Sequence, residues 1–305
     1  MSARLRIGPR WTALVGAGAL ALAAPVFGLE TVTLRHVHGL GYSPDGSRLM
    51  IPSHDGLSVY SGGRWSKAPG PKHDFMGFAV TRDFIISSGH PARGAGRANP
   101  LGLIRSRDGG RSWTRLDFEG EAEFHVVAAG YANNAVYVHN PAPNSRMPRP
   151  GIYRMIGQGP DWRGASGRGL HGEIHTLAVH PAQAELIAAA TSAGLFLSRD
   201  AGDEFKQVMA GAHATAAHFA LEGDSLWFSA FDGKPSLYRV AIGGDAREET
   251  ALPALERDAV ANIAQNPARR AEFAIVTFER AVFLTPDAGT TWTRIAPPRG
   301  SAPER

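Results

Sequence analysis

Ser106-Arg-Asp108-Gly-Gly110-Arg-Ser-Trp113 is a motif that returns twice further along the chain. The second copy is Ser198-Arg-Asp200-Ala-Gly202-Asp-Glu-Phe205, and the third is Thr285-Pro-Asp287-Ala-Gly289-Thr-Thr-Trp292. Asp200 and Asp287 are 87 residues apart, which fits two repeats of about 40 to 45 residues each, the length of a four-stranded propeller blade. The spacing therefore predicts an all-β chain made of repeated blades.

Each copy of the motif is expected to form the turn of a β-hairpin. The aspartates Asp108, Asp200 and Asp287 would accept hydrogen bonds from backbone N–H groups of the turn, and the glycines after them would supply positive φ. The closing aromatic side chains would pack between neighbouring blades; they are Trp113, Phe205 and Trp292. We interpret all six residues as structural, so the motif predicts an architecture and no substrate.

The pattern Ser/Thr-x-Asp-x-Gly-x-x-aromatic resembles the Asp-box, or BNR repeat, of sialidases, sortilin-type receptors and related β-propellers. Further phrases resemble a family of exported bacterial BNR-repeat proteins, labelled glycosyl hydrolase or sortilin-like by repeat content; they are His36-Val-His-Gly-Leu-Gly-Tyr42, Ile51-Pro-Ser-His-Asp-Gly-Leu57, Gly70-Pro-Lys-His-Asp-Phe-Met-Gly-Phe78 and Ser88-Gly-His-Pro91. The resemblance covers nearly the whole chain after residue 28. It implies the fold but no activity, because photosystem assembly factors and receptors share the Asp-box with sialidases.

The repeats between and around the motifs predict a single six-bladed β-propeller over residues 29–300, followed by a flexible tail over 301–305. Six segments begin with an apolar strand, near His36, Asp74, Phe124, Glu173, Ala217 and Ala261. A seven-bladed ring is the alternative, and it would need one blade shorter than about 38 residues, below the usual repeat length. Residues Glu30 to Arg35 are expected to add a strand to the last blade and close the ring.

Residues 1–28 have the features of an export signal. Arg4, Arg6 and Arg10 precede an uncharged apolar run from Trp11 to Ala24, which is too short to span a bilayer. The sequence holds no Cys, which excludes a lipoprotein anchor and a disulfide. We therefore expect a periplasmic or secreted protein, a monomer without a membrane span after signal cleavage.

Composition excludes several classes of function. The net charge of +4 includes three arginines and no acid in the first 28 residues, so the remaining chain carries only +1. Without a basic run, a nucleic-acid partner is not expected. The chain also contains no Gly-rich phosphate loop, no Ser nucleophile elbow and no His-Glu-x-x-His phrase, so no nucleotide cofactor is expected.

The histidines fall at equivalent positions of successive blades. When the six first strands are aligned on their apolar cores, one position holds His38, Met76, His125, His175, Ala217 and Ala261. First strands line the central channel of a propeller, so these side chains are expected at one level of the axis. Two residues earlier, on the same strand face, stand His36, Asp74, Glu123 and Glu173.

A further set of histidines ends the second strands, at the face of the ring where first strands begin, here called the upper face. These residues are His54, His90 and His139. Two Gly/Pro-rich insertions, Pro91 to Gly102 and Pro141 to Gly151, leave from the same face. Long loops of this kind often serve as lids or recognition loops.

Three imidazoles and one thioether at one level are the ligands that a soft or borderline transition metal prefers. We expect a metal at the channel mouth, held by His38, His125 and His175 with Met76, and with His36, His54, His90 and His139 around them. Imidazole suits copper and zinc, and the Met sulfur favours copper. The alternative is that these side chains are ordinary hydrogen-bonded or packed channel lining.

Two other functions remain open from the sequence, and with them the question of whether the protein is an enzyme. A glycoside hydrolase would need a pair of carboxylates across the channel mouth, and the candidates are Asp55, Asp74, Glu123 and Glu173. A sialidase is not expected, because the chain lacks an Arg-Ile-Pro phrase. A non-catalytic or assembly module would instead bind a protein, peptide or glycan on the upper face with the two insertions.

Overall fold

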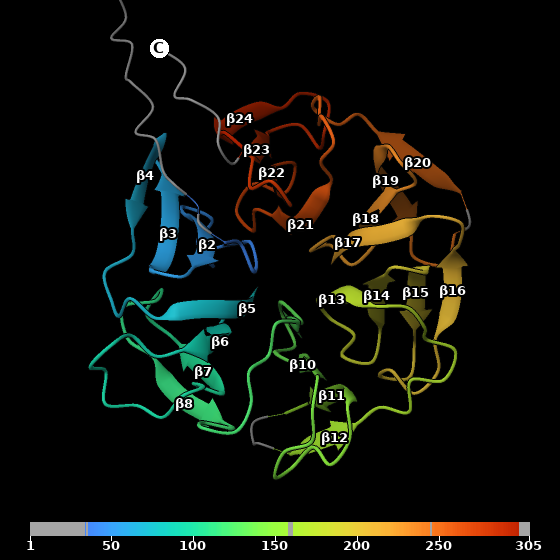
Figure 1. The fold of residues 1–305 in the computed structure, drawn as a ribbon. Coiled ribbons are helices and arrows are strands. Elements are labelled where there is room, and N and C mark those ends of the chain that lie inside the picture. The colour runs from blue at the N-terminus through green and yellow to red at the C-terminus, as the bar shows by residue number, and fades with distance from the viewer. Residues whose placement is uncertain (1–33, 35, 158–160, 245, 299–305) are drawn as a thin grey trace, which may run out of the picture.

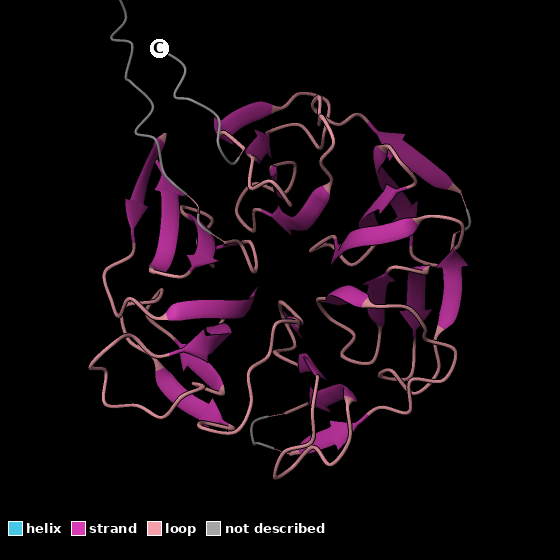
Figure 2. Ribbon diagram, in the orientation of Figure 1, coloured by secondary structure: helices cyan, strands magenta, loops and turns pink. Residues whose placement is uncertain are grey.

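The computed structural model describes residues 34, 36–157, 161–244 and 246–298, which form six four-stranded sheets arranged in a ring (Figure 1). Every strand pairing within a sheet is antiparallel. The described residues contain strands and loops and no helix, as Figure 2 shows. The predicted six-bladed β-propeller is confirmed, and the seven-bladed alternative is wrong.

Each blade is an uninterrupted stretch of four consecutive strands, with the first strand beside the central axis (Figure 1). Blades one and two contain β1 Gly41–Tyr42, β2 Leu49–Ser53, β3 Gly56–Ser61 and β4 Arg64–Lys67, then β5 Asp74–Val80, β6 Ile85–His90, β7 Leu103–Ser106 and β8 Thr114–Asp117. Blades three and four contain β9 Val127–Ala129, β10 Val136–Asn140, β11 Gly151–Met155 and β12 Trp162–Gly164, then β13 Ile174–Val179, β14 Ile187–Thr191, β15 Gly194–Ser198 and β16 Lys206–Met209. Blades five and six contain β17 His213–Phe219, β18 Ser225–Phe231, β19 Pro235–Ala241 and β20 Arg247–Thr250, then β21 Val260–Gln265, β22 Phe273–Thr277, β23 Val282–Thr285 and β24 Thr293–Ala296.

The three copies of the repeated motif form turns between the third and fourth strands of blades two, four and six, here called the motif turns. In the first, Ser106 Oγ donates to Asp108 at 2.8 Å and accepts the Gly110 N–H at 2.8 Å. Asp108 accepts the backbone N–H of Ser112 at 2.9 Å, and its equivalents Asp200 and Asp287 accept N–H groups four residues on, at 2.9 and 2.8 Å. Hydrogen bonds from Ser112 lower the pKa of Asp108 to about 2, because they favour the ionised carboxylate.

The hydrophobic core is divided among the contacts between blades. Six clusters of buried side chains are present in the described residues, and each joins two neighbouring blades. Phe205 lies in the cluster between blades three and four, Trp113 packs against the cluster between blades one and two, and Trp292 packs against the cluster between blades five and six. The aromatic ends of the motif turns thus contribute to the blade-to-blade packing.

The ring closes between blades six and one by side-chain packing and hydrogen bonds. Trp65 Nε1 donates to the Ile295 carbonyl at 2.7 Å, and Asn266 Nδ2 donates to the Gly46 carbonyl at 2.9 Å. Leu34 is buried in the cluster that joins these blades. The other residues of the expected closing strand, Glu30 to Arg35, lie outside the described residues, as do the expected signal peptide and tail.

No helix in the described part of the chain is long and apolar enough to cross a membrane.

Candidate metal centre

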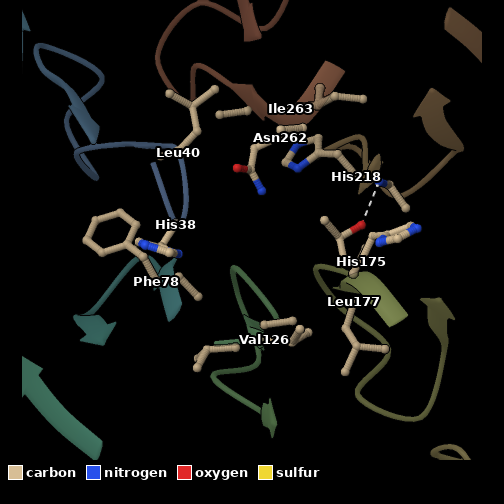
Figure 3. Close-up of a pocket in the computed structure, with 18 of the residues that line it drawn as sticks. His38, Leu40, Phe78, Val126, His175, Leu177, His218, Asn262 and Ile263 are labelled. Atoms are coloured by element: carbon tan, nitrogen blue, oxygen red, sulfur yellow. Dashed lines mark hydrogen bonds between the residues drawn. The ribbon is translucent and has the colours of Figure 1, made fainter. Parts of the chain in front are cut away.

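A cavity of about 530 Å³ occupies the central axis and is lined by the innermost segments of all six blades. Figure 3 shows His38, His218 and Asn262 at this space from different walls, with His175 on the wall of blade four and apolar side chains such as Leu177 beside them. A volume of this size falls within the range of about 300 to 1,000 Å³ that is usual for small-molecule sites. The channel therefore combines an imidazole-rich mouth with an apolar wall.

Three histidines of blade one come together at the upper face. The possible ligand atoms of His36, His38 and His54 all lie within 4.8 Å of one another. The ring centroids of His36 and His54 are 4.2 Å apart, and each is 6.0 Å from that of His38. The chain brings them together because the segment before β1 runs beside the turn that follows β2, and β1 and β2 are paired. This triad is the group of metal-ligating side chains that the described residues place within reach of one ion.

His38 has the properties of a ligand rather than of a charged surface residue. Burial and the neighbouring imidazoles of His125, His54 and His36 lower its pKa to about 4, because burial and like charge both disfavour the imidazolium. Its Nε2 atom is buried and has no hydrogen-bond partner, although buried polar atoms are nearly always paired. A neutral imidazole with an unused buried nitrogen is what a metal ion requires.

Asp74 fixes the orientation of His54. The Nδ1 atom of His54 lies 2.5 Å from Asp74 Oδ1, across the boundary between blades one and two. A proton held on Nδ1 by this carboxylate leaves Nε2 with its electron pair free. Carboxylates that orient metal-binding histidines in this way are usual around metal sites.

A second network continues from His38 towards blade three. The ring of His125 lies 5.6 Å from that of His38, and its Nε2 is 3.3 Å from Glu123. The other oxygen of Glu123 is 3.3 Å from His90 Nε2, and His90 Nδ1 pairs with Asn99 Oδ1 at 2.6 Å. Asn99 belongs to the insertion over 91–102. This loop is therefore attached to the edge of a group of imidazoles formed by the triad, His125 and His90, here called the imidazole cluster.

The ligand set expected from the sequence is not brought together as one site. His175 lies on the wall of blade four, where its ring stacks 6.4 Å from that of His213, and it is not part of the triad. Met76 is buried, with 7% of its surface exposed, and does not line the cavity. His139 is the penultimate residue of β10; it is half-buried and also lies outside the cavity lining.

Register irregularities remove Met76 from the predicted ring and bring further residues to the channel, whereas the five other positions line the cavity; they are His38, His125, His175, Ala217 and Ala261. Regular alternation was expected in all first strands, but pairing shifts within β5, β13, β17 and β21. An extra residue in a strand changes which side chains face the channel. His218 and Asn262 therefore also line the cavity, next to the predicted Ala217 and Ala261, and Figure 3 shows both on the channel wall.

The four candidate carboxylates separate into different environments. Asp74 and Glu123 contact the imidazoles described above, whereas Asp55 points to Lys67 Nζ at 2.5 Å and accepts the Ser53 hydroxyl at 2.8 Å. Glu173 lines the cavity on the His175 side. Asp74 and Glu123 are therefore the carboxylates that belong to the imidazole cluster.

His218 is a channel residue that sequence reasoning missed. Burial lowers its pKa to about 4, and its Nε2 has no hydrogen-bond partner. Thr215, on the same strand, also has a buried hydroxyl without a partner. The only sequence signal was the second histidine in β17, directly after the predicted channel position Ala217.

No family model and no curated protein matches the chain. Among solved structures, the GH74 enzyme of Niastella koreensis is similar with a TM-score of 0.60 and 12% identity over 88% of this chain and 46% of that one. The GH74 xyloglucanase of Xanthomonas campestris has a TM-score of 0.56 and 14% identity over 88% and 46%. YCF48 bound to D1 peptide has a TM-score of 0.50 and 14% identity over 86% and 84%. The chain spans less than half of the two GH74 enzymes, and at these identities the likeness shows the β-propeller fold alone.

Proposed function

We propose that this protein binds a transition-metal ion at the mouth of its channel through His36, His38 and His54. The observation that carries the proposal is the close grouping of their ligand atoms, within 4.8 Å. The buried Nε2 of His38, which has no partner, supports it. Three imidazoles fit an ion of the copper or zinc type.

Copper is the first choice and zinc the second, for a reason that differs from the one in the sequence. Met76 is buried away from the cavity, so a thioether no longer favours copper. For a site made of nitrogen ligands, affinity rises towards Cu²⁺ and falls again at Zn²⁺. We therefore expect Cu²⁺ to bind more tightly than Zn²⁺.

The protein's own residues would prepare this site for an open coordination position. Three protein ligands leave at least one position of a bound ion free for water or another ligand. Asp74 would hold His54 in the required tautomer through its contact with Nδ1. An ion bound here would supply Lewis acidity, or redox chemistry in the case of copper.

We also propose that the protein is exported, so that it meets this metal outside the cytoplasm. The proposal is supported by the arginines and the apolar run of residues 1–28. Expression in a bacterial host, followed by N-terminal sequencing of the periplasmic and medium fractions, tests it. Protein that keeps residues 1–28 and stays in the cytoplasm would contradict export.

The metal proposal is tested by elemental analysis of the full chain prepared without a histidine tag. The protein is loaded with Cu²⁺ or Zn²⁺ and dialysed against a weak chelator. We expect close to one retained ion per chain for the wild type. In the variant His36→Ala/His54→Ala, we expect the retained metal content to fall by about tenfold or more. The control is His171→Ala, which removes an exposed histidine outside the cavity lining. Equal metal contents in the double variant and the wild type would refute the proposal.

Peptide binding is the second candidate function. The observation that favours it is the match in length with YCF48, a structure determined with D1 peptide bound, of which the chain covers 84%. The two insertions at the upper face would then contact the peptide. A peptide library screened against the metal-free protein tests this function, and binding that survives His36→Ala/His54→Ala would favour it over metal binding.

A further inference from the structure

The channel below the triad has the form of a receptor for the apolar part of a ligand. A belt of side chains from five blades lines it, and each is 6 to 9% exposed; they are Leu40, Phe78, Val127, Leu177 and Ile263. His36 and His38 line the same cavity. A molecule that coordinates an ion at the triad would therefore extend its remaining atoms towards the apolar belt.

Phe278 provides an apolar surface at the mouth itself. Its side chain is 55% exposed, and it is the one residue among the exposed large hydrophobic residues of the described chain that also lines the cavity. The others, Ile156 and Val208, lie outside the lining. An aromatic ring in water at the edge of a concave site is a common binding element, because covering it with a ligand is favourable.

The loop that carries Phe278 is held firmly and lies next to the triad. The loop joins β22 to β23, and the Phe278 and Glu279 N–H groups donate to Ala259 O and to Asp258 Oδ1, each at 3.0 Å. Arg280 of the same loop donates to the carbonyl of Leu34 at 2.9 Å, two residues before His36. The aromatic ring and the imidazoles thus belong to adjoining segments of blades six and one.

We propose that the channel binds an organic nitrogen- or oxygen-donor ligand with a compact apolar body, which completes the coordination of the metal at the triad. The donor atom occupies the coordination position that the three imidazoles leave open. The apolar body lies against Phe278 and the belt of the channel, which exclude water from it. This inference rests on the proposed metal-binding function and adds to it the chemical class of the partner ligand.

The test compares two probes that share a donor atom and differ in apolar body, namely imidazole and 4-phenylimidazole. The full chain is loaded with Cu²⁺, its copper content is measured, and each probe is titrated while the visible absorption of the copper is followed. Copper iminodiacetate, which has open positions and no channel, gives the reference ratio of the two affinities. We expect the protein to favour 4-phenylimidazole by about tenfold or more beyond that reference, as burial of a phenyl ring predicts.

Matched variants assign the preference to the channel mouth. Phe278→Ala should reduce the preference for 4-phenylimidazole over imidazole by about threefold or more. Ile156→Ala, which truncates an exposed side chain outside the lining, should leave this preference unchanged. Wild-type protein that retains copper but shows only the reference ratio would overturn this inference alone. Wild-type protein that retains no copper would overturn the metal-binding function and this inference with it.

Discussion

At the scale of single residues, the contact between Asp74 and His54 orients one of the three proposed metal ligands. Asp74→Asn keeps the shape of the side chain but removes the charge beside Nδ1. We expect the affinity for Cu²⁺ to fall by about 10- to 100-fold, the usual effect of losing an orienting carboxylate. Competition with a chromophoric chelator measures this loss.

The control for Asp74 is the same substitution at Asp55. Asp55 is bound to Lys67 and Ser53 rather than to an imidazole. Asp55→Asn should therefore leave the copper affinity within about twofold of the wild type, because an exposed ion pair contributes little. Equal losses in the two variants would show that carboxylate charge in general, and not orientation of His54, controls affinity.

His218 predicts a dependence of stability on pH. Burial lowers its pKa from 6.5 to about 4 in the folded protein, so the unfolded chain takes up the proton first as the pH falls. The contribution of neutral His218 to the free energy of unfolding is fully present above about pH 6.5. It is lost as the pH falls from about 6.5 to 4, by up to about 3 kcal/mol. His218→Gln should flatten part of this decrease in urea unfolding curves measured between pH 7.5 and 4, and an unchanged slope would contradict the assignment.

The residues of the candidate metal site were only partly predictable. His36, His38, His54 and Asp74 were all selected from the sequence, because first strands begin and second strands end at the same face of a propeller. The grouping of the three histidines into a triad within blade one was not predicted, since it depends on how closely two loops approach each other. Sequence spacing gives the face on which a side chain lies, but not the distance between side chains on that face.

At the scale of elements, the motif turns contribute stability independently of the metal site. Asp200→Ala removes the acceptor for the Glu204 N–H and the Ser198 hydroxyl. We expect the free energy of unfolding to fall by about 1 to 3 kcal/mol, because donors to a charged group lose their partner. The control is Asp161→Ala, whose exposed carboxylate accepts hydrogen bonds from the exposed Arg163; this variant should cost less than about 1 kcal/mol.

The variant Asp200→Ala also tests whether stability and metal content depend on each other. The motif turns follow third strands and lie at the face opposite the triad, so Asp200→Ala should keep its full metal content in elemental analysis. Loss of metal together with stability would show that the two faces are coupled. Such turns were predictable because their hydrogen bonds are local, whereas the bulges in β5, β13, β17 and β21 arise from packing around the channel and leave no clear mark in the sequence.

At the scale of the whole molecule, a metal at the triad should stabilise the ring. An ion that binds only the folded protein adds about 2.7 kcal/mol when its free concentration is 100 times Kd. Cu²⁺ should therefore raise the melting temperature of the wild type and leave that of His36→Ala/His54→Ala unchanged. Thermal unfolding with and without Cu²⁺ measures the difference, and an equal shift in both proteins would indicate binding elsewhere.

Strand pairing does not fix the order in which the described blades follow one another along the chain. Each sheet in the described residues is one continuous segment, and the contact between blades six and one is made by side chains such as Trp65 and Asn266. The described ring consequently contains no strand that must come from a distant part of the sequence. A rearranged gene that began with blade four and ended with blade three would encode the same sheets and the same six contacts. For the described residues, the fold therefore does not depend on which blade comes first in the chain.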